Sequence, residues 1–188
     1  MKRREAIRRT SLMVGASAAA PALLSLIKGC TPERVPTWKA KAFTEQQSLT
    51  VEDVLDIIMP KTATPGALEL DVHKFIDDMV SIIFKEEKKK AFLQGLDALD
   101  HTAREKHGSV FSACTKEQKI AILTEEDKGG EDKVQVGGRP FFAEFKSLAT
   151  TGYFRTEVGC TQVKKHVGIP GRWDACIALE ANQPVWAE

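Results

Sequence analysis

The 188-residue sequence lacks the compact motifs by which most catalytic and metal sites are recognised. It has no His-Glu-x-x-His pair for zinc, no closely spaced cysteine pair followed by histidine for covalent haem, and no glycine-rich phosphate loop. A Gly-x-Ser-x-Gly nucleophile turn is also missing. The four histidines are scattered, and the four cysteines are too widely spaced to suggest an iron–sulfur cluster. We therefore predict a chain without catalytic residues, metal or cofactor of its own.

The charge balance excludes a further class of function. The whole chain has a formal net charge of +1, with 27 basic and 26 acidic residues. Six of the basic residues and one of the acidic residues fall within residues 1–29, so the remainder has 21 basic and 25 acidic residues, a net charge of −4. A mildly acidic body lacks the basic surface of a nucleic-acid-binding protein. Its length suits one compact domain.

The N-terminus has the features of an export signal. Arg3 and Arg4 precede residues 10–27, which carry no charge, and a basic start before an apolar stretch is typical of such signals. Arg3-Arg4-Glu5-Ala6-Ile7-Arg8 resembles the twin-arginine export pattern, whose route carries proteins that have already folded. The second pair, Arg8-Arg9, fits this pattern less well. The alternative is a basic flank on an ordinary signal or membrane anchor.

Cys30 indicates how the signal ends. Ile27-Lys28-Gly29-Cys30 resembles a lipoprotein cleavage site, although Lys28 stands where a small residue is usual. The competing cleavage site, after Ala18-Ala19-Ala20, would place Pro21 first in the mature chain. We predict that Cys30 carries lipid, that residues 1–30 are the signal, and that residues 31–43 form a short tether.

Residues 44–188 are predicted to be all-α, a compact bundle of about five to six helices with an irregular C-terminal tail. Thr44 and Thr115 each begin a capping box, in which a threonine and the glutamine three residues later satisfy each other's free amides. Pro60 is predicted to end the first helix. Asp71 is predicted to cap a second helix, with inward-facing Val72, Phe75, Ile76, Met79, Val80 and Ile83.

The later elements are predicted from the same kinds of signal. A third helix is expected over residues 86–106, with Gly108 ending it and a buried stripe of Phe92, Leu93, Leu96 and Leu99. Residues 125–138 form a charged, glycine-rich loop with a small hairpin around residues 134–136. A fourth helix is expected to begin at the Thr115 capping box and to run through residues 120–123. A fifth helix is expected over residues 140–150, with Pro140 at its first position. A short sixth helix is expected near residues 155–166, and the last twenty residues are expected to be ordered coil.

The remaining polar groups give only weak signals for chemistry. Helical spacing places four possible metal ligands on one face of the third helix: Asp97, Asp100, His101 and Glu105. The favoured interpretation is an exposed polar face stabilised by side-chain pairs. His73 beside Asp71 is weak evidence for acid–base chemistry. With Cys30 assigned to lipid, three cysteines remain: Cys114, Cys160 and Cys176. Either all three are free, or two form a disulfide bridge and the third is a free thiol.

Three stretches carry a resemblance to a known family. They are Ile-Ile-Met-Pro-Lys-Thr-Ala-Thr-Pro-Gly-Ala at residues 57–67, Gly-Tyr-Phe-Arg-Thr-Glu-Val-Gly at residues 152–159, and Pro-Gly-Arg-Trp-Asp-Ala-Cys at residues 170–176. The chain resembles, from about Phe43 to its end, subunit 3 of membrane-bound gluconate 2-dehydrogenase. The resemblance implies an accessory role, because catalysis in such complexes lies in a larger FAD-containing flavoprotein of the glucose–methanol–choline type.

The resemblance also implies partners and a location. The large flavoprotein often lacks its own export signal, so the small subunit would escort it through the twin-arginine translocase and hold it at the membrane. A cytochrome c frequently accepts the electrons. The expected location is the periplasm or cell envelope. Cys160 stands where a small residue is expected and inherits no role. The alternative function is a free-standing lipoprotein binding module without a dehydrogenase partner.

The partner-binding surface is predicted in the C-terminal third. Large aromatic side chains on irregular backbone are suited to anchor an interface. The predicted anchors are Tyr153, Phe154 and Trp173, with the charged residues Arg172 and Asp174 at the rim. The alternative is that the aromatic side chains only hold the tail against the helices. If they do, the turn at residues 60–66 is the next candidate surface.

Overall fold

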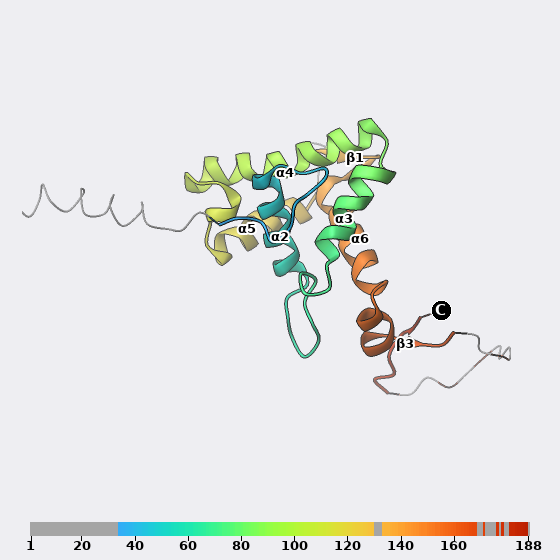
Figure 1. Ribbon diagram of the computed structural model, residues 1–188. Coiled ribbons are helices and arrows are strands. Elements are labelled where there is room, and N and C mark those ends of the chain that lie inside the picture. Colours follow the sequence, from blue (N-terminus) through green and yellow to red (C-terminus); the bar gives the residue numbers. More distant parts are fainter. Residues whose placement is uncertain are drawn as a thin grey trace, which may run out of the picture. The chain divides into compact units, whose positions relative to one another are not determined.

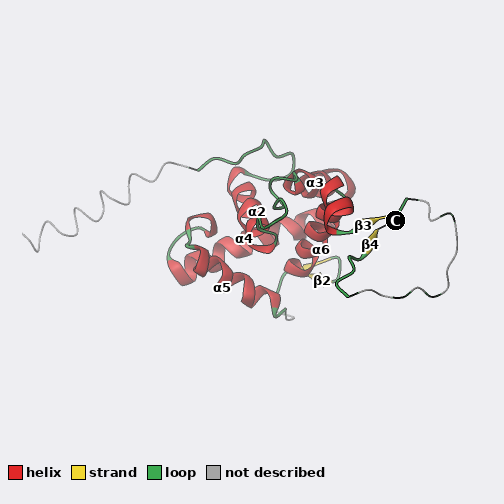
Figure 2. Ribbon diagram, turned by 90° about the horizontal axis from the view of Figure 1, so that it is seen from below, coloured by secondary structure: helices red, strands yellow, loops and turns green. Residues whose placement is uncertain are grey.

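The computed structural model describes residues 34–129, 133–168, 171, 176, 178 and 181–187. One compact unit spans Pro36–Glu188, and its described part confirms the predicted all-α fold (Figures 1 and 2). Its helical elements are α2 (Glu45–Ile58), α3 (Val72–Asp78), the π-helical turn η1 (Met79–Ile83), α4 (Glu86–His107), the 3-10 turn η2 (Phe111–Ala113), α5 (Lys116–Asp127), α6 (Phe141–Phe154) and the π-helical turn η3 (Gly159–Val163).

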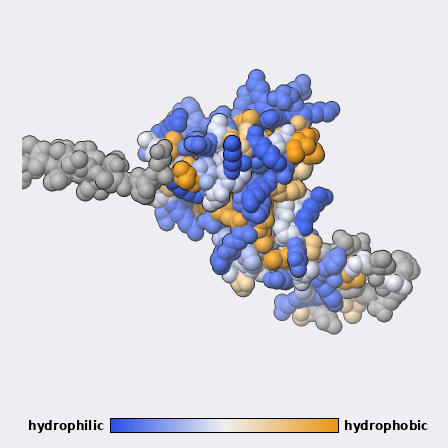
Figure 3. Space-filling model, viewed as in Figure 1, coloured by the Kyte–Doolittle hydropathy of each residue, from blue (hydrophilic) through white to orange (hydrophobic). Residues whose placement is uncertain are grey.

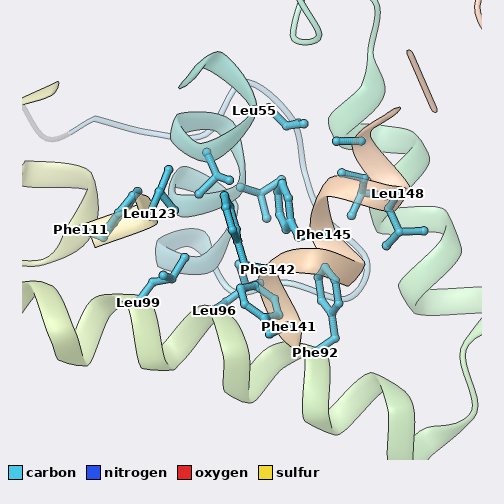
Figure 4. Packing of buried hydrophobic residues seen from close by; sticks show 14 of the residues in the cluster. Leu55, Phe92, Leu96, Leu99, Phe111, Leu123, Phe141, Phe142, Phe145 and Leu148 are labelled. Atoms are coloured by element: carbon cyan, nitrogen blue, oxygen red, sulfur yellow. The ribbon is translucent and has the colours of Figure 1, made fainter. Parts of the chain in front are cut away.

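The longest helix, α4, lies along one side of the unit and contacts α2, α5 and α6, while α3 packs against α6 (Figure 1). The core lies between these helices, and Figure 4 shows side chains from all of them meeting there. The Phe92 ring lies 5.1 Å from the Phe141 ring and 6.0 Å from the Phe145 ring, centroid to centroid. None of the described helices is long and apolar enough to span a membrane.

Local sequence signals set several helix ends as predicted. In both capping boxes the threonine hydroxyl accepts from the glutamine N–H while the glutamine side chain accepts from the threonine N–H, at Thr44 with Gln47 and at Thr115 with Gln118. Gly108 ends α4 in the left-handed conformation, with φ 70°, which glycine adopts without a steric penalty.

The second predicted helix differs from the structure at both ends. Asp71 precedes α3 but makes no capping hydrogen bond; its backbone is left-handed, with φ 56°, whereas a capping residue has an extended backbone. Its carboxylate instead lies 2.9 Å from the Lys74 ammonium. At the other end, Ile83 was predicted to face inward and is 63% exposed. The π-helical turn adds a residue to the helical repeat, which rotates Ile83 out of the buried stripe.

The C-terminal elements also depart in part from prediction. The hairpin is present, with β1 (Gln135–Val136) antiparallel to β2 (Arg139–Pro140), so Pro140 precedes α6 instead of occupying its first position. The predicted sixth helix is limited to a short segment that includes η3, followed by β3 (Lys165–His166), which pairs in parallel with β4 (Trp186–Ala187). Much of the predicted C-terminal coil lies outside the described residues.

Residues 36–43, assigned by sequence to the tether, lie against the helical unit, and we call them the strap. The Thr37 N–H and hydroxyl donate to one carboxylate oxygen of Glu52, at 2.7 and 2.6 Å. The backbone N–H groups of Lys41 and Ala42 donate to the two carboxylate oxygens of Asp77, at 2.8 and 2.9 Å. These buried carboxylates on α2 and α3 therefore fasten the strap across both helices.

Candidate functional site

A hydrogen bond across the fold joins two of the three sequence stretches that suggested function. The Tyr153 hydroxyl, near the end of α6, donates to the Pro65 carbonyl at 3.0 Å and lies 3.3 Å from the Thr64 hydroxyl. The loop between α2 and α3 extends away from the helical body in Figure 1, and this contact ties it to α6. Because the Tyr153 side chain is buried, it holds the loop within the chain, and it is not exposed as the sequence analysis predicts for a partner-binding residue.

The loop between α2 and α3 is held in one conformation by its own hydrogen bonds. The Ala67 N–H donates to the Met59 carbonyl at 3.0 Å, closing the loop at its base, and the Thr62 N–H donates to the Thr64 carbonyl at 3.0 Å near its tip. Glu69 accepts from the Gly66 N–H at 3.2 Å and pairs with Lys61 at 2.6 Å. The Lys61 ammonium and the Gly66 N–H lower the pKa of Glu69. A rigid loop loses little entropy on binding.

Phe154 lies next to Tyr153 and is partly exposed. Its ring meets the Tyr153 ring edge-on, with centroids 5.3 Å apart, and the Lys164 ammonium lies 4.5 Å from the Phe154 ring centroid. Gly159 fixes this arrangement: a Cβ there would lie 2.2 Å from the Tyr153 carbonyl oxygen. The glycine therefore lets η3 pack directly on the last turn of α6.

The exposed part of the loop offers the side chains of Pro60, Lys61, Thr62 and Ala63. These groups can make van der Waals contacts and hydrogen bonds, which suits recognition of another surface, while the Lys61 ammonium is paired with Glu69. Sequence reasoning named the aromatic side chains and the turn as separate candidates. It missed their contact, because a single tyrosine gives no signal for a partner 88 residues away.

Other predicted site residues are placed as follows. The predicted export and lipid residues, Arg3, Arg4 and Cys30, lie outside the described residues, as do the predicted partner residues Arg172, Trp173 and Asp174. Three cysteines are described, and each is a free thiol: Cys114 is buried, Cys160 donates to the Phe154 carbonyl at 3.0 Å, and Cys176 is exposed.

The possible metal ligands on α4 serve structural roles. Asp100 accepts from the Phe111 N–H at 3.0 Å and so fixes the start of η2, while Asp97 accepts from the Gln47 side chain at 2.8 Å. His101 and Glu105 form an exposed pair 3.4 Å apart. In the part of the chain that the structure describes, no group of three or more histidine, cysteine or acidic side chains could hold a metal ion.

His73 is a buried titratable group between α3 and the strap. Its ring centroid lies 4.6 Å from that of Trp38, and its Nδ1 makes no hydrogen bond. Its Nε2 is 3.8 Å from the Asp71 carboxylate, too far for a hydrogen bond. Burial lowers the pKa of His73, and Lys74 adds to this, while Asp71, Glu52 and Asp77 oppose it.

We expect His73 to make the fold less stable in mild acid. The lowered pKa means that, below the ordinary histidine pKa of about 6.5, the unfolded chain binds a proton that the folded chain resists. The free energy of unfolding should therefore fall as pH drops from about 7 to about 5, by at most about 1.4 kcal/mol per pH unit for one proton. Urea unfolding at each pH measures it. His73→Phe should flatten the slope and exposed His101→Gln should not; an unchanged slope in His73→Phe would assign it to other groups.

Tyr153→Phe tests the contact between α6 and the loop. Removing the hydroxyl should lower the free energy of unfolding by about 1 kcal/mol, the usual net value of one hydrogen bond, and should loosen the loop. Limited trypsin digestion should then cut faster after exposed Lys61, while cutting after Lys116, at the start of α5, serves as the internal control. If trypsin cuts after Lys61 at the same rate in the wild type and in the variant, the loop's own hydrogen bonds hold it without the Tyr153 contact.

Comparison with known proteins gives one match. A family model described as gluconate 2-dehydrogenase subunit 3 matches residues 45–171. No curated protein and no solved structure matches the chain. The match covers more than half of the 188 residues and includes two of the three resembling stretches, residues 57–67 and 152–159. It also spans both sides of the contact that Tyr153 makes with the loop. The chain belongs to the gluconate 2-dehydrogenase subunit 3 family.

Proposed function

We propose that this chain is the non-catalytic accessory subunit of an FAD-dependent sugar or polyol dehydrogenase in the cell envelope. The observation that carries the proposal is the family match over residues 45–171, since the family is named for a subunit of a dehydrogenase. The loop that Tyr153 ties to α6 supports a binding role because its exposed groups suit contact with another protein. FAD belongs to the larger partner subunit, and a cytochrome c is its electron acceptor.

The leader suggests how the two subunits travel. Arg3 and Arg4 match the twin-arginine pattern, whose translocase carries folded proteins, so a flavoprotein without a signal crosses as the bound partner of this chain. Cys30 then holds the pair at the membrane through lipid. In this proposal the chain supplies the export address, the escort and the anchor, while the chemistry takes place in the partner.

Co-purification tests the proposal most directly. The full chain, tagged at its C-terminus and expressed in its own host, should bring down a larger protein, and the absorption spectrum of the complex should show oxidised flavin. After separation of the subunits, flavin should remain with the larger one. Recovery of this chain alone from intact membranes would favour the free-standing lipoprotein instead. Flavin retained by this chain would contradict a non-catalytic role.

Cys30→Ala tests the anchor. If Cys30 carries two or three acyl chains, the substitution should move the protein from the membrane to the soluble fraction or leave it with an uncleaved signal, because several chains hold a protein far more firmly than one. Fractionation and the intact mass of the mature chain measure both results. Cys160→Ala is the matched control and should stay on the membrane. A wild-type mature chain whose mass includes no lipid would rule out the anchor.

A further inference from the structure

An exposed apolar tip lies at the end of η1, just before α4 begins. Ile82 and Ile83 are 66% and 63% exposed, and they end the π-helical turn η1, in which the Phe84 N–H donates to the Met79 carbonyl at 3.0 Å. In Figure 3 this apolar patch stands out over the turn between η1 and α4, next to hydrophilic side chains of α4. An α-helical continuation would have turned Ile83 inward, so the π-helical turn is what exposes it.

The tip is bordered by positive charge. Residues 85–90 contain four lysines and two glutamates, in a body that carries four more acidic than basic residues, and apart from Lys88 and its partner Glu144 the segment has an excess of one positive charge. Lys88 pairs with Glu144 at 2.6 Å and covers the Phe84 ring. Lys85 and Lys90 are exposed and Lys89 is partly exposed. Glu86 and Glu87 are exposed in the same segment, and the three lysines outnumber them. An apolar tip followed by exposed lysines is complementary to a membrane with anionic headgroups.

The chain geometry allows this tip and a lipid on Cys30 to engage the same membrane. Trp38 of the strap contacts His73, and nine residues of helix separate His73 from Ile82, about 14 Å at 1.5 Å per residue. Because the strap is held against the helices from Pro36 onward, the part of the tether that can extend is the six residue steps from Pro36 back to Cys30, which span at most about 20 Å. The reach of the tether therefore exceeds the distance along the helix from the strap to the tip.

We propose that Ile82 and Ile83 insert into the surface of an anionic phospholipid membrane, with Lys85, Lys89 and Lys90 binding the headgroups. The inference rests on the proposed membrane attachment at Cys30. The tip is a second contact that orients the domain. With one attachment at the tether and one at η1, the helical domain is held in a defined orientation while its other surfaces stay available to a protein partner.

The test places a fluorescent probe at the tip. Ile82→Trp in the full chain, purified from membranes and mixed with excess vesicles of phosphatidylcholine and phosphatidylglycerol, should be quenched by nitroxide-labelled lipid. Ile120→Trp, at another exposed isoleucine on α5, is the matched control and should not be. Each lysine changed to glutamine among Lys85, Lys89 and Lys90 should lower the ratio of inserted to free tip about fivefold, the effect of about 1 kcal/mol per charge. Unchanged melting temperatures show that the variants are folded.

The outcomes separate this proposal from the proposed anchor. Quenching at position 82 alone supports insertion, and it can be read with excess vesicles even if the chain carries no lipid. Absence of quenching there, or equal quenching at positions 82 and 120, overturns it. The double variant Ile82→Ser/Ile83→Ser should still co-purify with the flavoprotein. If it loses the flavoprotein and position 82 is not quenched, the tip is a protein contact and the membrane proposal fails while the accessory role stands.

Discussion

Replacing Lys119 by alanine is expected to lower the free energy of unfolding by about 3–5 kcal/mol, the usual cost of breaking a buried ion pair from one side. The Lys119 ammonium lies 2.8 Å from the Asp53 carboxylate, and the two side chains are only 11% and 9% exposed. The pair joins α5 to α2, two helices that also line the core. Alanine removes the cation from beside a buried carboxylate, so the contribution that Lys119 makes toward offsetting the desolvation of Asp53 is lost.

Two comparisons make this result specific to the buried pair. Lys41→Ala breaks an exposed pair with Asp78, whose ammonium and carboxylate are 2.6 Å apart, and should cost much less because water solvates both partners. The double variant Lys119→Met/Asp53→Leu removes both charges and keeps the volume, so it should recover most of the loss. Urea unfolding followed by helical circular dichroism measures all three. If Lys119→Ala costs no more than Lys41→Ala, the pair is effectively solvated.

This ion pair also shows where sequence reasoning reaches its limit. The capping boxes at Thr44 and Thr115 and the glycine at position 108 were predicted because each depends on residues within one helical turn. The apolar residues between Thr44 and Pro60 recur near helical spacing, which predicts a helix but not what covers its polar positions. In the structure, residues 47–55 are all buried, polar ones included. The strap and α5 cover the polar face. Thr37 of the strap binds Glu52 from 15 residues away, and Lys119 of α5 binds Asp53 from 66 residues away.

The errors at Asp71 and Ile83 have a related cause. Aspartate is a good helix cap when its backbone is extended, but Asp71 is held in the left-handed conformation where the loop after residue 66 enters α3. Helical periodicity assumes 3.6 residues per turn, and the π-helical turn at Met79–Ile83 breaks that assumption. Neither departure leaves a local signature in the residues concerned.

The candidate site was predictable in its parts and not in its assembly. Residues 57–67 and 152–159 were singled out by resemblance, and Tyr153 by its size and setting. That the Tyr153 hydroxyl meets the Pro65 carbonyl depends on how α3 and α6 pack, which pattern alone does not give. The structure thereby joins two separate candidates, the loop between α2 and α3 and the last turn of α6, through one contact.

Export gives the largest functional effect that we expect. Changing Arg3 and Arg4 to lysine, together with Arg8 and Arg9, keeps every charge in the leader but replaces planar guanidinium groups by ammonium groups, which do not bind in the same geometry. If the twin-arginine route is used, this chain should remain in the cytoplasm. In the proposed function the flavoprotein partner has no signal of its own and crosses only when bound to this chain, so it should remain in the cytoplasm too.

The measurement is fractionation of cells into cytoplasm and envelope, with each subunit detected by antibody and flavin-dependent dehydrogenase activity assayed in both fractions. Arg104→Lys, the same change at an exposed position near the end of α4, is the matched control and should leave export unchanged. The complex in the cytoplasm of the fourfold lysine variant should still contain flavin, since the leader takes no part in folding or binding.

Normal export of both subunits by the fourfold lysine variant would mean that the leader serves the ordinary secretory route. Because that route carries unfolded chains, the partner would then need a signal of its own, and the escort role would fall with it.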